Sequence, residues 1–174
     1  MKSATHFCLQ CGTALILKEF EGRLREICPG CGWVNYEHLK LSAGARVEND
    51  GRVLLVQRAH EPWQGCWHLP SGYVEVDENP ARAAEREVRE ESGLIIRAGH
   101  LIDAYIYRDD PRGNGVILVY QAEYISGEPR PSSETEASGF FTAEEVRHLP
   151  LAGESGTQEI NDWLDSKKNG RHHD

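Results

Sequence analysis

Three glutamates on one face of a short helical segment are the feature that most restricts how this chain can fold. At about 100° per residue, the helical spacing of Glu87, Glu90 and Glu91 places all three carboxylates on the same side. Like charges three or four residues apart oppose helix formation by a few tenths of a kcal/mol per pair. A run of Glu and Arg is usually a solvated face, but a bound multivalent cation would remove the repulsion and give this spacing a use.

Capping residues on both sides predict where this helix begins and ends. Asn79 is a good N-cap, Pro80 suits the first turn, and Gly93 suits the left-handed position that ends a helix. The apolar residues between them are few and small, namely Ala81, Ala83, Ala84 and Val88. Core packing alone therefore offers the helix only a thin apolar stripe.

The residues around the helix follow a fixed register. Five residues separate Gly72 from Glu78, seven more separate Glu78 from Arg86, and the segment then continues as REVREESGL to Leu94. This register resembles the Nudix box of the Nudix hydrolases at every defining position. The resemblance implies an α/β fold, the Nudix αβα sandwich around a mixed sheet, and hydrolysis of a diphosphate bond.

The resemblance also implies roles for individual residues. It assigns the ligands of a catalytic Mg²⁺ or Mn²⁺ to four positions: Glu87, Glu90, Glu91 and the backbone carbonyl of Gly72. It implies that Arg86 orients a box carboxylate and pairs with Glu78, although Glu78 could contact the metal instead. Such cations prefer oxygen ligands, neutralise the phosphate oxygens and help to deprotonate the attacking water.

Further side chains outside the box are candidates for the site. The loop SSETEASGFF brings Glu134 and Glu136 just before an apolar strand. By resemblance, Glu136 best matches the extra metal-binding or basic glutamate of many family members, although a plain acidic loop would look the same. Arg46 and Arg58 lie on or beside the first two expected strands, where they could contact phosphate or be solvated or ion paired.

Four of the five cysteines form a C-x2-C-x16-C-x2-C pattern, at Cys8, Cys11, Cys28 and Cys31. This spacing fits a four-thiolate zinc site. A disulfide framework is typical of secreted chains, and a redox C-x-x-C normally opens a helix, whereas each pair here is followed by a turn-forming glycine. The pattern therefore favours a structural Zn²⁺.

The cysteines and the box divide the chain into two predicted domains, a zinc ribbon at residues 1–38 and a Nudix domain at residues 39–174. Residues 13–27 hold two short β-like runs and are too few to bury a core, so a metal must stabilise them. A ribbon ahead of a Nudix box resembles the N-terminal module of bacterial NADH pyrophosphatases and of related FAD and ADP-ribose hydrolases.

Apolar patterning predicts the remaining elements of the larger domain. Strands are expected at residues 41–48, 52–58, 101–107 and 116–124. The turn NDG between the first two strands is a hairpin signal. Helices are expected at residues 142–146 and 157–168, and strands between helices fit a layered sandwich.

Composition limits the partners of the chain. Its 174 residues carry a net charge of −9, which argues against a general affinity for nucleic acid. No apolar run approaches membrane-spanning length, and the N-terminus lacks the apolar core of a signal peptide. We therefore expect a cytoplasmic protein with a nucleotide substrate and no nucleic-acid or membrane partner, and leave a homodimer open.

The box indicates the reaction class and leaves the substrate open. The NADH pyrophosphatases carry a downstream S-Q-P-W-P-F-P signature, and residues 98–121, AGHLIDAYIYRDDPRGNGVILVYQ, lack it. The resemblance therefore implies a nucleoside diphosphate linked to another moiety, with ADP-ribose or FAD ahead of NADH, cleaved to AMP and a phosphorylated product. The alternative is a non-catalytic nucleotide sensor whose ribbon binds a partner, but binding alone does not require three clustered acids.

Overall fold

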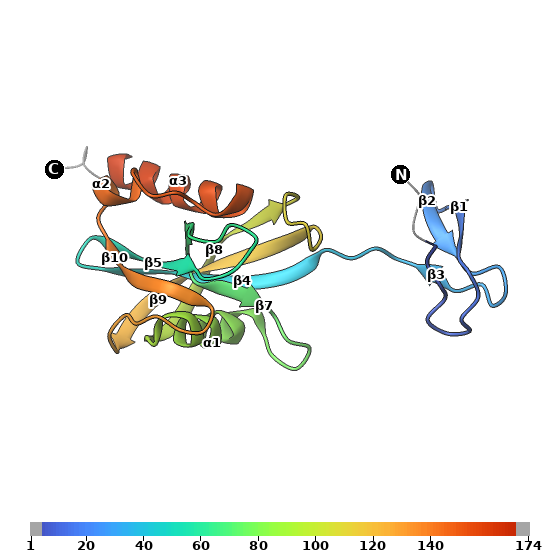
Figure 1. Cartoon of the computed structure of the whole chain (residues 1–174), viewed down its shortest axis with the longest axis horizontal. Helices are drawn as coiled ribbons and strands as arrows, with labels where there is room; N and C mark the ends of the chain where they lie inside the picture. The colour runs from blue at the N-terminus through green and yellow to red at the C-terminus, as the bar shows by residue number, and fades with distance from the viewer. Residues whose placement is uncertain (1–4, 170–174) are drawn as a thin grey trace. The chain divides into compact units, whose positions relative to one another are not determined.

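The computed structural model describes residues 5–169, and the chain divides between His38 and Leu39 into two compact units. Each unit has its own sheet (Figure 1). In the described part of the chain, no helix is both long and apolar enough to cross a membrane.

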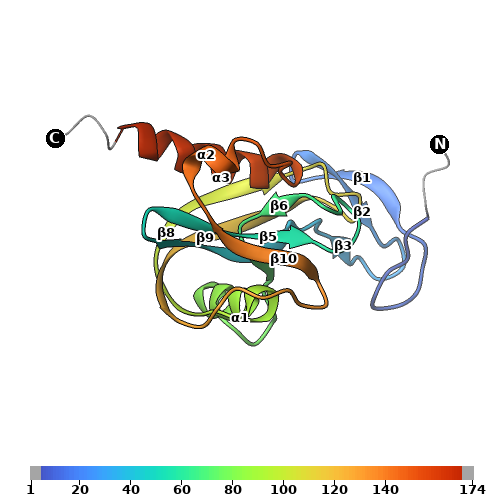
Figure 2. The same ribbon diagram turned by 60° about the vertical axis from the view of Figure 1, so that its left-hand side comes forward.

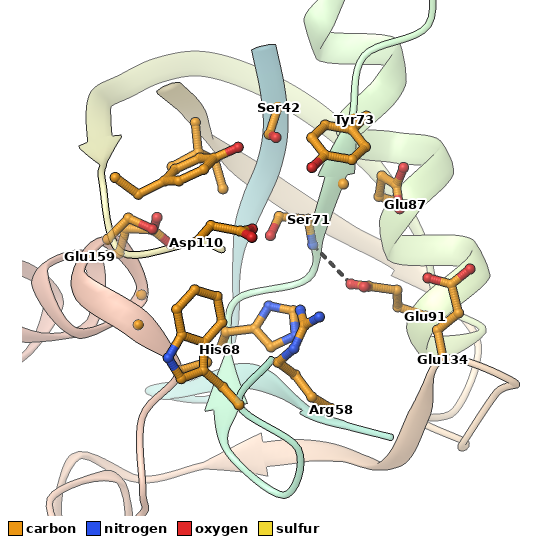
Figure 3. A pocket seen from close by; sticks show the side chains of 18 of the residues that line it. Ser42, Arg58, His68, Ser71, Tyr73, Glu87, Glu91, Asp110, Glu134 and Glu159 are labelled. Carbon is orange, nitrogen blue, oxygen red and sulfur yellow. Dashed lines mark hydrogen bonds between the residues drawn. The ribbon is translucent and has the colours of Figure 1, made fainter. Parts of the chain in front are cut away.

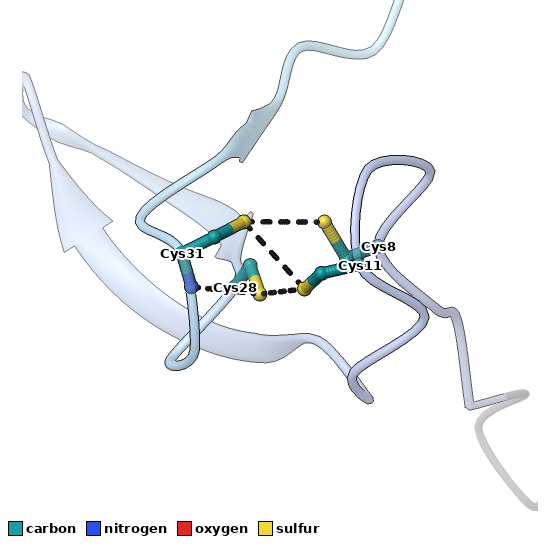
Figure 4. A group of neighbouring side chains, drawn as sticks. All are labelled: Cys8, Cys11, Cys28 and Cys31. Carbon is teal, nitrogen blue, oxygen red and sulfur yellow. Dashed lines mark hydrogen bonds between the residues drawn. The ribbon is translucent and has the colours of Figure 1, made fainter.

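The smaller unit is built around its four cysteines. Its sheet has three antiparallel strands, β1 (Ile16–Phe20), β2 (Arg23–Ile27) and β3 (Val34–Asn35). Each Cys-x-x-Cys turn closes through a glycine with positive φ: the N–H of Gly12 donates to the carbonyl of Cys8 at 2.9 Å, and that of Gly32 to Cys28 at 3.0 Å. These turns bring the four sulfur atoms toward one another (Figure 4).

The larger unit contains a mixed sheet of seven strands: β4 (Lys40–Asn49), β5 (Arg52–Arg58), β6 (Trp67–His68), β7 (Ser71–Tyr73), β8 (Ile95–Tyr107), β9 (Gly115–Ser126) and β10 (Thr135–Phe141). The main path runs β10-β5-β4-β9-β8, with β6 paired to β5 and β7 to β4. The β4–β9 pair is parallel and the other pairs are antiparallel.

Helices cover both faces of this sheet. Figures 1 and 2 show α1 (Pro80–Ser92) along one face, and α2 (Ala143–Val146) and α3 (Gly153–Asn169) along the opposite face. The predicted α/β sandwich around a mixed sheet is confirmed.

Strand alternation sorts the apolar side chains into two cores. Val53 and Leu55 of β5 pack in the layer under α3, while Leu54 between them packs in the layer under α1. The α3 layer receives Ile160, Trp163 and Leu164, whereas α1 buries only Ala83, Ala84 and Val88 among its apolar residues. The small side chains of α1 let its backbone approach the sheet closely, which brings the glutamates of this helix next to β7.

The helix α1, which has capping signals at both ends, lies where the sequence predicted it, whereas β8 and α3 begin earlier than predicted. Asn79 caps α1 by accepting a hydrogen bond from the N–H of Arg82 at 3.0 Å, and Gly93 ends the helix at φ 76°. β8 begins at Ile95, ahead of the expected residue 101, because its register against β9 shifts between Ala98 and Leu101 and interrupts the alternation. α3 also begins earlier than expected, at Gly153.

Candidate active site

A cavity of about 380 Å³ lies between the two helical layers of the larger unit. Glutamates of α1 line one side of it, Glu159 of α3 lies on the opposite side, and residues of β4 and β7 lie between them (Figure 3). This volume is within the range of small-molecule binding sites.

The three predicted glutamates of α1 all line the cavity. Glu87 and Glu91 are 8% and 5% exposed, whereas Glu90 is open to solvent. The N–H of Ser71 donates to Oε2 of Glu91 at 2.8 Å, so the strand β7 fixes one of the carboxylates. The acidic face expected from helical spacing is therefore one wall of a cavity.

Arg86 holds this acidic wall together. Its Nη1 donates to Oε1 of Glu87 at 2.6 Å and to Oε2 of Glu90 at 3.1 Å, and its Nη2 donates to Oε1 of Glu78 at 2.6 Å. The carboxylate of Glu78, followed by that of Glu87, raises the pKa of Arg86, and Arg86 lowers the pKa of Glu78. The predicted pair of Arg86 with Glu78 is present.

The two buried carboxyl groups of α1, those of Glu87 and Glu91, both have raised pKa values. Burial, together with the nearby carboxylates of Glu87 and Glu134, raises the pKa of Glu91 to about 8, against the hydrogen bond from Ser71. Burial also raises the pKa of Glu87, against its contact with Arg86. A divalent cation would favour the ionised form of both groups, and these oxygen donors fit a hard cation of the Mg²⁺ type.

Gly72 brings its backbone into contact with the acidic wall. It pairs with Ala43 of β4, and a Cβ atom built on it would lie only 2.3 Å from Cδ and Oε1 of Glu87. Any other residue would push this carboxylate away. The backbone at Gly72 and the Glu87 carboxylate can therefore serve one bound cation only because this residue has no side chain.

Besides Arg86, two other arginines place positive charge in the same cavity. Nε of Arg58 donates to the carbonyl of Pro62 at 2.8 Å, and in the part of the chain that the structure describes its terminal nitrogens have no hydrogen-bond partner. Arg112 forms a bidentate ion pair with Asp110, in which Nη2 donates to Oδ2 at 2.7 Å and Nε donates to Oδ1 at 3.0 Å. Burial and the nearby Arg112 lower the pKa of Arg58, so an anion bound there would be favourable.

Two predicted residues lie outside the cavity. Arg46 donates to Oε1 of Gln121 at 3.2 Å and forms an ion pair with Glu48, so its guanidinium interacts with side chains of the sheet. Glu136 is exposed and accepts a hydrogen bond from Gln64 at 3.4 Å. Neither of them is among the lining residues.

Glu134 takes the place in the cavity expected for Glu136. The N–H of Ala59 donates to the carbonyl of Glu134 at 2.9 Å, and the side chain lies near Glu91 (Figure 3). The pairing of β10 with β5 shifts register between Thr135 and Ala137, so Glu136 is the extra residue of a bulge. A bulge turns a side chain out of the alternation, which explains why Glu136 does not line the cavity.

Other lining residues were not singled out from the sequence: Ser42, Trp63, His68, Asp110, Arg112 and Glu159. For three of these residues the sequence does contain a signal. Asp110 and Arg112 are opposite charges two residues apart in a polar turn, and Glu159 lies four residues before Trp163, on the apolar face of its helix. Ser42 and Trp63 gave no signal that local patterning could detect.

The four cysteines of the smaller unit form a second donor set. Their sulfur atoms lie within 4.8 Å of one another, with 3.4 Å between Cys11 and Cys28 and 3.6 Å between Cys8 and Cys31. A tetrahedral metal with Zn–S bonds of about 2.3 Å separates its sulfurs by about 3.8 Å, whereas a disulfide requires about 2.05 Å. The thiols therefore fit a tetrahedral metal better than a disulfide.

Comparison with known families assigns both units. The profile described as NUDIX domain matches residues 38–164, and the profile described as Nudix N-terminal, a zinc ribbon, matches residues 6–37. Among solved structures, a NUDIX hydrolase from Nitrosomonas europaea superposes with a TM-score of 0.77 and 28% identity, covering 94% of this chain and 93% of that one.

Two named relatives are similar in sequence. An ADP-ribose pyrophosphatase of Methanocaldococcus jannaschii is 32% identical over 130 residues, which are 74% of this chain and 75% of that protein. A NAD-capped RNA hydrolase, NudC, of Pseudomonas aeruginosa is 31% identical over 145 residues, which are 83% of this chain. This match spans only 50% of the length of that second relative.

Proposed function

The chain belongs to the Nudix hydrolase family, and on that premise we propose that it hydrolyses the pyrophosphate bond of a nucleoside diphosphate linked to a second moiety. The observation that carries the proposal is one cavity lined both by the carboxylates of α1 and by Arg58 and Arg112. Carboxylates can hold a divalent cation, and arginines can bind the phosphate oxygens that this cation helps to neutralise.

We assign the binding of Mg²⁺ or Mn²⁺ to four groups: the carboxylates of Glu87, Glu90 and Glu91 and the backbone carbonyl of Gly72. When bound, the cation supplies positive charge to the phosphate oxygens and lowers the pKa of water. Arg86 is a positioning residue in this scheme, because it orients Glu87 and Glu90 through its Nη1.

The protein side chains bind the diphosphate and move one proton. Arg58 and Arg112 hold phosphate oxygens, and Glu134 accepts a proton from the attacking water. The oxygen of that water bonds to one phosphorus, and the bond from this phosphorus to the bridging oxygen breaks. The bridging oxygen leaves on the other phosphate, so ADP-ribose gives AMP and ribose 5-phosphate.

ADP-ribose is the substrate that we place first, ahead of FAD and NADH. The support is the similarity to a protein named ADP-ribose pyrophosphatase, which covers about three quarters of both chains. The only support for FAD as a substrate is the resemblance of the zinc ribbon to the N-terminal module of related FAD hydrolases. NAD-capped RNA belongs among the compounds to be tested, because relatives that are named for it match this chain over half their length.

We also propose that the four cysteines hold one structural Zn²⁺. Four thiolates complete a tetrahedral zinc shell and leave no position for water, so this metal would stabilise the smaller unit without taking part in hydrolysis.

The experiment that tests the function compares kcat/KM for ADP-ribose, FAD, NADH, NAD-capped RNA and a nucleoside triphosphate in the presence of Mg²⁺. We expect the highest value for ADP-ribose, with AMP as a product. A triphosphate preferred by a wide margin would overturn the substrate assignment.

A matched pair of variants tests the proton acceptor. Glu134→Gln should lower kcat by about 10²–10⁴-fold, the usual contribution of a general base. Glu136→Gln makes the same change two residues away and outside the cavity, so it should retain the kcat of the wild type. Equal effects of the two variants would contradict the role of Glu134.

A further inference from the structure

Glu159 is a buried acid that the hydrolysis of the diphosphate does not use. It is 3% exposed, it lines the cavity from α3, and its Oε1 is buried without a hydrogen-bond partner in the described residues. Burying an unpaired polar atom is costly, and native structures rarely retain one without a reason. A ligand that fills the cavity would supply the missing partner.

The end of the cavity at Glu159 is distinct from the acidic wall formed by the glutamates of α1. In Figure 3, Glu159 lies across the cavity from Glu87, Glu91 and Glu134. The titratable groups on this side of the cavity are Asp162 on α3, Tyr105 and Tyr107 on β8, His68 on β6, and Asp110 after β8 with its ion-pair partner Arg112. Burial lowers the pKa of His68 to about 4, so His68 is neutral at pH 7, and the charge of Arg112 is paired with Asp110. Among the described residues, the carboxyl of Glu159 therefore has no ion-pair partner.

An aromatic ring also lines the α3 side of the cavity. Trp63 borders the cavity with its backbone in the left-handed region at φ 62°, a conformation that is costly for a bulky residue. A Cβ atom on Gly153, the first residue of α3, would lie 3.1 Å from Cζ2 of Trp63, so the helix start packs against the indole. Ile117, which is 5% exposed, adds apolar surface. An indole, an aliphatic wall and one polar group suit a planar heterocycle.

We propose that Trp63 and Glu159 form a nucleobase subsite, in which adenine lies against the Trp63 indole and pairs its exocyclic amine and an adjacent ring nitrogen with the Glu159 carboxyl. The subsite deepens the pyrophosphatase function proposed above and rests on it. It places the base on the α3 side of the cavity, with the diphosphate toward the carboxylates of α1.

The chemistry of the carboxyl group matches this ligand. Burial, followed by the charge of Asp162, raises the pKa of Glu159 to about 8, so the protonated form is present at neutral pH. A protonated carboxyl offers one donor and one acceptor side by side, and adenine offers an amine donor beside a ring-nitrogen acceptor.

The test pairs two variants with two substrates. Glu159→Gln keeps a donor beside an acceptor, whereas Glu159→Leu removes both. The substrates are ADP-ribose and its analogue in which unsubstituted purine replaces adenine, so that only the exocyclic amine is missing. We expect the wild type and Glu159→Gln to favour ADP-ribose in kcat/KM by roughly tenfold, and Glu159→Leu to treat both substrates alike.

The pH dependence of this preference is a second readout. The preference of the wild type should decline as the pH rises through about 8, whereas that of Glu159→Gln should stay constant. Because the titration of the proposed metal-binding carboxylates affects both substrates equally, it cancels in the ratio of their kcat/KM values. A preference that persists in Glu159→Leu, or that Glu159→Gln loses as fully as Glu159→Leu, would overturn the subsite.

Stability and binding measurements keep the inference separate from the proposed function. Glu159→Leu removes a buried unpaired group, so its melting temperature should be at least that of the wild type. If the wild type hydrolyses no nucleotide with Mg²⁺, the proposed function fails, and calorimetric titration with AMP still tests the subsite. Roughly tenfold weaker AMP binding by Glu159→Leu than by the wild type and Glu159→Gln would support it, and equal binding would refute it.

Discussion

Gly72→Ala is the change that should separate catalysis from stability most clearly. A Cβ atom on Gly72 would lie 2.3 Å from Cδ and Oε1 of Glu87 and 2.4 Å from Oε2. Carbon contacts are favourable near about 3.5 Å, so the Glu87 carboxylate must retreat by roughly 1 Å. The φ of Gly72 lies outside the left-handed region, so an alanine can keep the backbone conformation.

The displaced atoms are at the end of a flexible side chain, so the fold should survive. An overpacked site typically costs about 1–3 kcal/mol, and we expect a loss of unfolding free energy at the low end of this range. Catalysis is more sensitive, because a 1 Å misplacement can cost about 10²-fold in rate. We therefore expect kcat/KM for ADP-ribose to fall by about 10²-fold and the half-saturating Mg²⁺ concentration to rise.

Steady-state kinetics over a Mg²⁺ titration, together with thermal melting, measure both effects. Gly139→Ala is the matched control, since its new Cβ would meet Cε2 of Phe141 at an ordinary 3.5 Å. The control should keep full activity and the Mg²⁺ dependence of the wild type. If Gly72→Ala did the same, the close contact between Gly72 and Glu87 would have no part in metal binding.

Three further predictions concern zinc, pH and Arg86. Protein purified without chelators should contain one zinc per chain and Cys28→Ser none; elemental analysis finding no zinc in the wild type would refute the site. His68 has a pKa of about 4 in the folded chain and about 6.5 unfolded, so only the unfolded chain gains a proton as the pH falls between these values. Stability should then fall by up to about 3 kcal/mol from pH 6.5 to 4, and parallel urea-unfolding profiles for His68→Asn would contradict this. Arg86→Lys cannot fork between carboxylates and should lower kcat/KM more than tenfold with the fold retained; wild-type kinetics would remove Arg86 from the positioning scheme.

Signals that lie close together in the sequence predicted the acidic wall. The cap at Asn79, the left-handed Gly93 and the spacing of the glutamates all belong to one helix, so neighbouring residues decide the structure. The pair of Arg86 with Glu78 is also local, since the loop before α1 returns onto the helix.

The rest of the cavity depends on contacts between distant segments. Glu134 and Glu136 are two residues apart, so regular strand alternation would place both side chains on the same face of the sheet. The bulge formed when β10 pairs with β5 separates them, and only Glu134 enters the cavity. Arg46 sits on a strand as expected, but its neighbour Gln121 comes from the parallel partner β9. The position of Trp63 follows from a loop with positive φ, which no periodic pattern predicts.

The release of AMP from ADP-ribose, with Mg²⁺ supplied or withheld, tests the central claim most directly when the wild type is compared with Glu90→Gln. Withholding Mg²⁺ rather than adding a chelator avoids removing the Zn²⁺ that we propose at the four cysteines. Glu90 is exposed, so its replacement removes the charge of a proposed metal ligand without disturbing the core. We predict AMP and ribose 5-phosphate only when Mg²⁺ is supplied, at a rate that Glu90→Gln lowers by orders of magnitude. AMP formed as fast without Mg²⁺, or as fast by Glu90→Gln at saturating Mg²⁺, would contradict the claim that the carboxylates of α1 hold the catalytic cation.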